Sequence, residues 1–155
     1  GLSDRQALQQ AMTEMNQPAY LIEELITDAV AEVLIGVVGD PVHGYLLTLA
    51  AGGVLTELLA DSQSLLFPVT DEQVAAAADR LKLAPVLAGY RGNPAADFDK
   101  LIDAVLAVQA CVDAFRQQDD GQAAISEIEI NPLILTPTRA VAVDALIRKG
   151  DSTDV

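Results

Sequence analysis

The chain has 155 residues, enough for one domain with a substantial core, and 51% of them are hydrophobic, which excludes a disordered chain. The formal net charge of −14 argues against nucleic acid and anionic membrane surfaces as partners, because both are bound through a surplus of Lys and Arg. No apolar run reaches the roughly 18 residues of a membrane-spanning helix, and the single Cys suits a reducing compartment, so we predict a cytoplasmic protein.

The first residues predict a helix and a longer parent chain. Ser3 and Gln6 have the spacing of a capping box, so a helix is expected over about 4–15. Asn16, Gln17 and Pro18 would end it. Because the chain has no initiator Met and enters this helix almost at once, we expect it to be a fragment of a longer protein.

Apolar runs predict the strands of the next part of the chain. Residues 19–26 (AYLIEELI) favour a strand. Residues 30–38 (VAEVLIGVV) are β-branched and almost continuously apolar, as in a central buried strand. Further strands are expected at 45–53, which ends in a Gly pair, and at 64–69, whereas residues 54–59 favour neither helix nor strand.

Two helices are expected in the second half. Thr70 and Gln73 form a second capping box, which predicts a helix over about 71–83. After a loop at 89–94 (GYRGNP), whose Asn and Pro suit the cap and the first helical position, a long helix should cover about 94–118. Its predicted buried stripe is Leu101, Val105, Val108, Val112 and Phe115, and Cys111 between them is expected to be a packing residue.

The last part of the chain predicts two more strands, over about 126–135 and 140–147, and a polar tail at 148–155. Helices and neighbouring strands are therefore mixed along the sequence. We predict an α+β fold with a mixed, largely antiparallel sheet and packed helices, forming one domain.

Oxygen-bearing side chains on these two strands predict a metal site. If Pro137 and Thr138 form the loop, Asn131 faces Asp144 directly, with Cβ atoms about 4.5–5.5 Å apart. Two short oxygen ligands at that distance can share Mg²⁺, which usually takes only one or two ligands from protein. Glu129 lies on the same face and could be a third ligand or a supporting partner of the other two.

Two other interpretations of this hairpin stay open. Glu127, Glu129 and Asn131 could simply be the solvated face of an amphipathic strand. Pro132 removes a ladder hydrogen bond, so it indicates a bulge or a sheet edge, and a slip of one residue would put Asn131 and Asp144 on opposite faces. In favour of the metal site, Asp144 interrupts an otherwise apolar run that looks buried, and a buried carboxylate needs a partner.

Six segments of the chain carry a resemblance to a known family. They are EVLIGVVGDPVHG (32–44), LAAGGVLTELL (49–59), LFPVTDEQ (66–73), VLAGYRGNPAAD (86–97), EIEINPLIL (127–135) and VAVDALI (141–147). In this order they resemble segments of the ATP-grasp domain in the nucleoside-diphosphate-forming acyl-CoA synthetases, relatives of the succinyl-CoA synthetase β subunit. The resemblance covers nearly the whole chain.

The resemblance implies the C-terminal part of an ATP-grasp fold, which clamps a nucleotide between two α+β subdomains. A helix within about 1–18 would enter from the N-terminal part of that domain, residues 19–147 would form the core, and 148–155 the tail. The family interconverts acid, CoA and nucleoside triphosphate with acyl-CoA, nucleoside diphosphate and phosphate. Its phosphohistidine and its CoA site belong to a CoA-ligase domain or subunit, and its phosphate-gripping Lys lies upstream of Gly1, so we expect no catalytic residue in this chain.

By the same resemblance, Asn131 and Asp144 match the Mg²⁺ ligands beside the phosphates of ATP or another nucleoside triphosphate, with Glu129 close by. Glu23, Glu24 and Leu25 match the hinge that binds the adenine, although the family commonly has Gln-Glu-Met there.

Three further residues are nucleotide-binding candidates from their own chemistry. Gly52 and Gly53 could let the backbone approach a ligand, or could form a plain bulge at the end of a strand. Arg91, in a Gly-bounded loop, suits a phosphate or carboxylate, or a surface ion pair.

The single His, His43, lies in a turn and could be structural or lie near the active site.

We predict that the full protein is an acid–CoA ligase and that this fragment alone is inactive. Two other functions stay open: a non-catalytic interaction module, and an ATP-grasp enzyme that joins a carboxylate to an amine.

Overall fold

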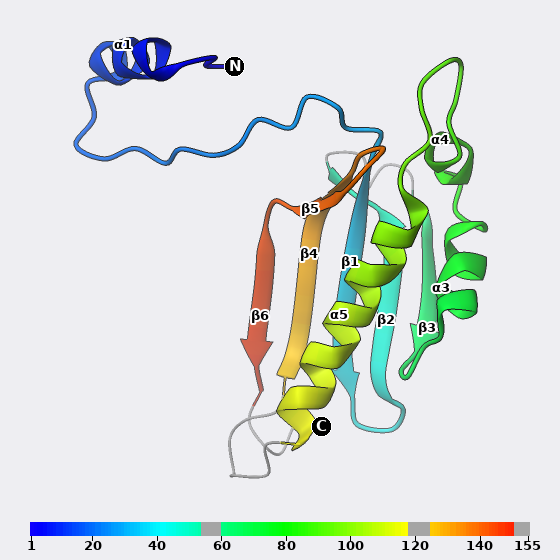
Figure 1. Ribbon diagram of the computed structural model, residues 1–155. Coiled ribbons are helices and arrows are strands. Elements are labelled where there is room, and N and C mark those ends of the chain that lie inside the picture. Colours follow the sequence, from blue (N-terminus) through cyan, green and yellow to red (C-terminus); the bar gives the residue numbers. More distant parts are fainter. Residues whose placement is uncertain (54–59, 118–124, 151–155) are drawn as a thin grey trace.

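The structure is a computed structural model that describes residues 1–53, 60–117 and 125–150. It contains a six-stranded sheet in the order β3-β2-β1-β4-β5, with β6 also pairing with β4, and every pairing is antiparallel (Figure 1). The predicted α+β class is confirmed. The strands are β1 Ala31–Asp40, β2 Gly44–Ala51, β3 Ser62–Leu66, β4 Ile125–Leu135, β5 Ala140–Ala142 and β6 Ala145–Lys149.

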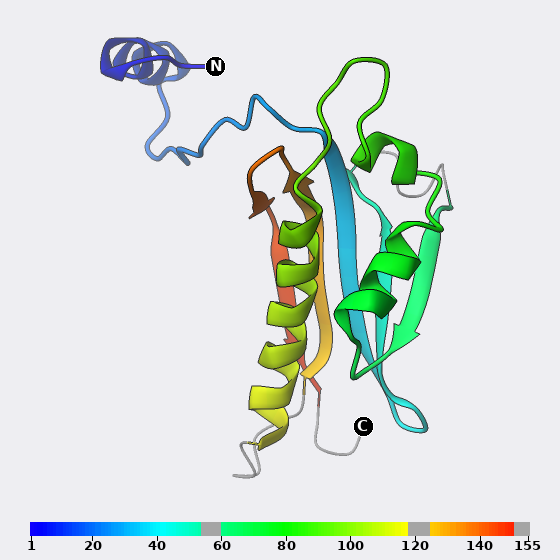
Figure 2. The ribbon, with the colours of Figure 1, turned by 45° about the vertical axis from the view of Figure 1, so that its right-hand side comes forward.

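Helices cover one face of this sheet and leave the other face open among the described residues. Figures 1 and 2 show α3 and α5 packed side by side against the same face. The core lies between these helices and the inward side chains of the central strands. The helices are α1 Arg5–Met15, α3 Asp71–Ala78, α4 Ala84–Leu87 and α5 Phe98–Gln117. In the parts of the chain that the structure describes, no helix is both long and apolar enough to cross a membrane.

β1 is the central strand, as predicted, because it pairs with β2 on one side and with β4 on the other. Its core-facing side chains, Val33, Ile35 and Val37, have no exposed surface. The alternate side chains face the uncovered side of the sheet, where Glu32 and Val38 are exposed. The continuous apolar run therefore makes a strand that is buried on one face only.

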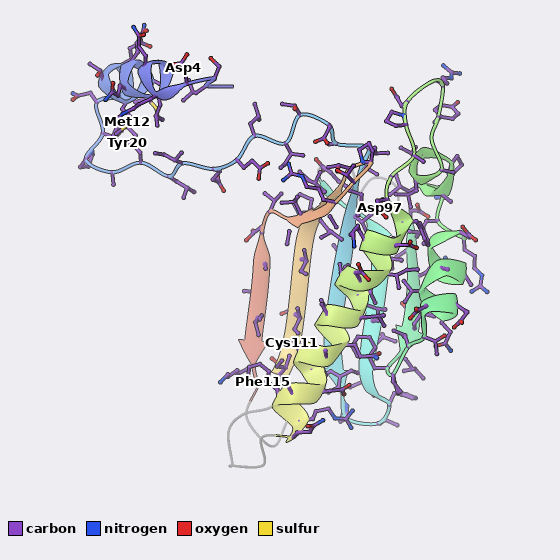
Figure 3. All side chains as sticks on the ribbon, viewed as in Figure 1. Asp4, Met12, Tyr20, Asp97, Cys111 and Phe115 are labelled. Atoms are coloured by element: carbon purple, nitrogen blue, oxygen red, sulfur yellow. The ribbon has the colours of Figure 1, made fainter. Side chains whose placement is uncertain are left out.

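α1 stands away from the sheet (Figure 1), and none of its residues is buried. Its cap is Asp4 and not the predicted Ser3: the Asp4 carboxylate accepts a hydrogen bond from the Ala7 N–H at 2.8 Å. After the helix, the Tyr20 hydroxyl donates to the Met12 carbonyl at 2.5 Å and folds the exit of the chain against it (Figure 3).

The predicted strand over 19–26 is wrong. This segment belongs to a long connection between α1 and β1 that pairs with no described strand (Figure 1). An extended segment becomes a strand only when a neighbour takes up its backbone hydrogen bonds. Its large side chains Leu21, Ile22 and Leu25 are exposed.

α3 has the predicted capping box, with both the Thr70 and the Gln73 bonds formed, but it ends at Ala78 and not near 83. The buried Asp61 carboxylate explains the early end. It accepts hydrogen bonds from the backbone N–H groups of Lys82 and Leu83, at 2.9 and 3.1 Å, so those groups do not continue the helix.

α5 begins at Phe98, four residues later than predicted. The N–H of Ala96 donates to the Leu87 carbonyl and that of Asp97 to the Thr136 carbonyl, both at 2.9 Å. These two bonds keep Ala96 and Asp97 out of the helix. The predicted stripe is confirmed: Leu101, Val105, Val108 and Val112 are buried, and Phe115 and Cys111 are partly buried against the same core.

The predicted strand over 140–147 is two short strands, β5 and β6, separated by Val143 and Asp144. The run around Asp144 is exposed and not buried as expected, because β6 has no described strand on its outer side and no described helix packs over it. Arg148 and Lys149, assigned to the tail, belong to β6. Residues 54–59, 118–124 and 151–155 lie outside the described ranges.

Candidate functional site

The hairpin register that the sequence predicted is confirmed. Leu133 pairs with Ala142 before the break between β5 and β6, and Ile130 pairs with Ala145 after it. Asn131 therefore lies opposite Asp144, and its N–H donates to the Asp144 carbonyl at 3.2 Å.

Pro132 does cause an irregularity, but on the other side of β4. The register between β1 and β4 shifts between Val33 and Ile35, where Asn131 and Pro132 together oppose Leu34. Such a bulge absorbs an extra residue without changing the neighbouring hairpin. On the side of β5 and β6, the Pro132 carbonyl still accepts the Val143 N–H at 3.0 Å, so the pairing survives.

Glu129, Asn131 and Asp144 line one cavity of about 250 Å³, together with Ala145 and Leu146. Ile128 and Ile130 line a groove on the side of α5, so the residues that alternate with them point to the uncovered face. The Asp144 side chain is exposed, and the structure gives its carboxylate no hydrogen bond or ion pair within the described ranges. The cavity thus presents oxygen atoms to solvent on the open face of the sheet.

The Asn131 side chain is held at both ends. Its Oδ1 accepts a hydrogen bond from the Gly53 N–H at 3.1 Å, and its Nδ2 donates to Glu129 Oε1 at 3.3 Å. The amide is half-buried, and these two bonds fix which way it points.

The predicted Gly pair makes a close backbone approach beside this site. The Gly52 N–H donates to the Glu32 carbonyl at 2.8 Å, and a Cβ at Gly52 would lie 2.7 Å from the carbonyl carbon of Val33. Gly53 has φ +68°, and a Cβ there would overlap the Glu32 carboxylate. Glu32 was not predicted near the site, because nothing in the local sequence connects it to Gly53.

The donor set is two carboxylates and one amide oxygen. Within residues 1–53, 60–117 and 125–150, no three His, Cys, Asp or Glu side chains come close enough together to hold a metal ion on their own. The set does fit a hard cation for which the protein supplies only a few of the ligands. Mg²⁺ commonly takes one or two carboxylate or amide oxygens from protein and completes its coordination shell with water and phosphate.

The predicted hinge residues lie in the connection before β1 and do not line this cavity. Glu23, Glu24 and Leu25 are exposed. Glu24 Oε1 accepts from Arg139 Nη2 at 2.5 Å, which ties the connection to the turn between β4 and β5. The hydrogen bond and the charge of Arg139 lower the pKa of Glu24.

Arg91 lies in the predicted loop after α4 with φ +51°. Its Nε donates to the Tyr90 hydroxyl at 3.1 Å, and its guanidinium lies 5.3 Å from the centre of that ring. The alternative of a surface ion pair is not seen, since no carboxylate of the described chain pairs with it. The structure does not bring Arg91 into the cavity of Asn131.

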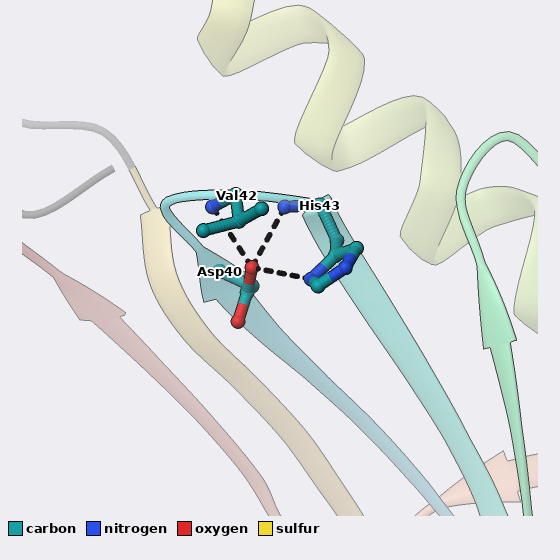
Figure 4. A network of polar contacts seen from close by, with 3 residues as sticks. All are labelled: Asp40, Val42 and His43. Atoms are coloured by element: carbon teal, nitrogen blue, oxygen red, sulfur yellow. Dashed lines mark hydrogen bonds and ion pairs between the residues drawn. The ribbon is translucent and has the colours of Figure 1, made fainter.

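His43 lies in the turn between β1 and β2 (Figure 4), at the far end of β1 from the site. The six-residue distance from Leu34 to Asp40 along the strand corresponds to about 20 Å. Asp40 Oδ1 accepts hydrogen bonds from the His43 N–H at 2.7 Å and the Val42 N–H at 2.9 Å, and lies 2.9 Å from His43 Nδ1. The structure therefore favours the structural role of His43.

An apolar groove of about 550 Å³ lies on the other face, between α5 and the strands β4 to β6. It contains none of the candidate residues. Its walls are mostly aliphatic, with a few charged side chains among them, namely Lys100, Asp103 and Arg139.

The comparison with known families gives a match between the ATP-grasp domain family and residues 1–148. Among curated proteins, the chain is 34% identical over 122 residues to the ADP-forming acetate–CoA ligase II subunit beta of Pyrococcus furiosus, which covers 77% of this chain and 49% of that protein. It is 31% identical over 114 residues to the corresponding ligase I subunit beta, with 74% and 46% covered. The chain thus spans about half the length of these curated relatives.

Solved structures agree with these sequence matches. PH1788 from Pyrococcus horikoshii has a TM-score of 0.71 and 26% identity, covering 95% of this chain and 61% of that one. The dinucleotide-forming acetyl-coenzyme A synthetase 1 of Ca. Korarchaeum cryptofilum, solved with coenzyme A and Mg-AMPPCP, has a TM-score of 0.72 and 22% identity and covers 95% and 65%. With a family match over almost its whole length, the chain belongs to the ATP-grasp domain family.

Proposed function

We propose that this chain is the Mg²⁺- and nucleotide-binding part of an ADP-forming acid–CoA ligase, which transfers phosphoryl between ATP and a phosphohistidine. The observation that carries this proposal is the pairing of Asn131 with Asp144 in one open cavity. The names of the curated relatives support the ligase class. The structure of a neighbour with Mg-AMPPCP supports the nucleotide and the metal.

Asn131 Oδ1 and the Asp144 carboxylate would hold the Mg²⁺ that accompanies the nucleotide, with Glu129 beside them. The ion supplies neutralisation of charge on the phosphate oxygens. The chain's own contribution is to place these oxygens on the uncovered face of the sheet, where a nucleotide can reach them. The chain is otherwise strongly acidic, and acidic side chains do not bind phosphate. The cationic side chains that bind the phosphates would therefore come from another part of the protein.

The connection before β1 would hold the base of the nucleotide. There, Glu23 to Leu25 would offer backbone groups to the base. The carboxylate of Glu24 is already bound to Arg139, so the backbone is the available part of that residue. Gly52, Gly53 and Arg91 remain candidates for nucleotide binding. Of these, Gly53 contacts the cavity, through its hydrogen bond to Asn131.

The partners that this function requires are the N-terminal part of the ATP-grasp domain and a CoA-ligase domain or subunit that carries the phosphohistidine and binds CoA. The exposed apolar side chains in the N-terminal arm, residues 1–30, would pack against the N-terminal part of the ATP-grasp domain. Leu2, Met15, Leu21, Ile22 and Leu25 are each more than half exposed. Cytoplasmic localisation stays a prediction from composition.

The test is Mg-ATP binding and acyl-CoA formation by the complete protein, with Asn131→Ala and Asp144→Ala. Each variant should weaken Mg-ATP binding by about tenfold or more, because each removes one ligand oxygen from a shell that has few protein ligands. Asp99→Ala, a change of the same size and charge on the exposed start of α5, is the control. Unchanged affinity and turnover in both site variants would refute the proposal.

A further inference from the structure

We propose that Glu129 is not a metal ligand but a positioning residue: together with the Gly53 N–H, it orients the Asn131 amide so that Oδ1 is the atom presented to the cation. This inference rests on the proposed function, because it assigns a role within the same site.

The two hydrogen bonds on the Asn131 side chain are complementary. The Gly53 N–H is a donor and faces Oδ1 at 3.1 Å, and the Glu129 carboxylate is an acceptor and faces Nδ2 at 3.3 Å. If the amide turned over, the NH₂ group would face the Gly53 donor and the oxygen would face the carboxylate. Both contacts would then be repulsive, so the pair selects one orientation. Oδ1 keeps a second lone pair that can bind a cation.

The Gly53 N–H is itself held in place by the central strand. The neighbouring Gly52 donates to the Glu32 carbonyl, and its Cα lies so close to Val33 that a Cβ would overlap the backbone. Gly53 then takes a positive φ, which glycine adopts readily. The Gly pair therefore acts on the site through Asn131, because it fixes the direction of the Gly53 N–H that binds Oδ1. Glu129 fixes the other end of the same amide, Nδ2.

Glu129 has the geometry of a supporting partner. One of its carboxylate oxygens is bound to the Asn131 amide, and the side chain is half-buried beside it on the same strand. Residues that hydrogen-bond a metal ligand commonly fix its orientation, and their loss weakens metal binding by about 10–100-fold. A residue in this role must accept a hydrogen bond, but it does not need a negative charge.

That difference gives the test. Glu129→Gln keeps an acceptor oxygen at the same reach and removes the charge, whereas Glu129→Ala removes both. Mn²⁺ binding to the complete protein in the presence of ADP, followed by electron paramagnetic resonance, should be about tenfold weaker for Glu129→Ala and within about twofold of the wild type for Glu129→Gln. Equal weakening in both variants would mean that the charge itself matters and would overturn the inference, as would unchanged binding by Glu129→Ala.

A second measurement keeps the inference testable if Glu129→Ala does not fold. The side-chain NH₂ resonances of Asn131, observed by ¹⁵N NMR without metal, report its hydrogen bond directly. They should stay close to the wild-type position in Glu129→Gln, because the Nδ2 hydrogen bond is kept. A large shift of these resonances in Glu129→Gln, or an unchanged spectrum in a folded Glu129→Ala, would contradict the positioning role.

Asp144→Ala in the same Mn²⁺ assay separates this inference from the proposed function. If Asn131→Ala and Asp144→Ala both bind Mn²⁺ like the wild type, the metal site itself fails. If Asn131→Ala and Asp144→Ala bind Mn²⁺ more weakly, and Glu129→Gln loses as much Mn²⁺ affinity as Glu129→Ala, the metal site stands and only the positioning role fails.

Discussion

At the residue scale, the carboxylate of Asp40 organises the turn between β1 and β2. Hydrogen bonds from the backbone N–H groups of His43 and Val42, and from the His43 ring, lower its pKa. A lowered pKa in the folded state means that the ionised carboxylate stabilises the fold above the pKa of the unfolded chain, about 3.9 for Asp. This stability is lost as the pH falls through the lower pKa of the folded state.

Asp40→Ala should therefore lower the melting temperature at neutral pH, and the difference from the wild type should shrink as the pH falls below about 4. His43→Ala should lower it less, because both backbone N–H groups keep their acceptor and these are the larger causes of the shift. Thermal unfolding followed by circular dichroism between neutral and acid pH measures both effects. A difference that does not depend on pH would show that Asp40 acts through something other than its charge.

The candidate site was predictable from sequence at some residues and not at others, for a physical reason. Asn131 and Asp144 belong to one hairpin, so a short turn and strand alternation were enough to place them opposite each other. Gly53, just after β2, contacts Asn131, and Glu32 of β1 lies beside Gly53. The contact between Gly53 and Asn131 spans 78 residues of sequence, and no local pattern encodes it.

At the scale of elements, boundaries were harder to predict than the elements themselves. Some missed boundaries depend on hydrogen bonds between distant parts of the chain, such as Asp97 with Thr136 at the start of α5. The missed end of α3 depends on Asp61, whose carboxylate joins the start of β3 to the connection between α3 and α4.

Asp61→Ala should lower the free energy of unfolding by about 2–4 kcal/mol, because two backbone N–H groups lose a charged acceptor in a partly buried place. Asp61→Asn keeps an acceptor oxygen for one of them and should lose roughly half as much. Urea unfolding measures both values. Equal losses in the two variants would mean that the hydrogen bonds to Lys82 and Leu83 are not what Asp61 contributes.

At the scale of the whole molecule, the described helices cover one face of the sheet and leave the other open, and the N-terminal arm extends beyond the sheet (Figure 2). The sequence predicted the class and the central strand, because periodicity and composition are local. It placed a strand in the arm because an apolar run looks the same whether or not a neighbour pairs with it. The described tether of this arm to the core includes the ion pair between Glu24 and Arg139.

Glu24→Gln should loosen this tether, and protease should cleave the segment between α1 and β1 faster than in the wild type. Glu23→Gln is the matched control, since it removes the same charge at the neighbouring residue and leaves the ion pair between Glu24 and Arg139 intact. Because the pKa of Glu24 is lowered, the wild type should behave like Glu24→Gln only when the pH falls below the usual range of Glu, about 4.3. Equal cleavage of both variants at neutral pH would contradict the tether.

The most direct test of the central claim is a crystal structure of the complete protein with a Mn²⁺–nucleotide complex, with the metal located by its anomalous scattering. We predict a peak within about 2.5 Å of both Asn131 Oδ1 and an Asp144 oxygen, on the uncovered face of the sheet. A nucleotide-bound Mn²⁺ that touches neither residue would contradict the account.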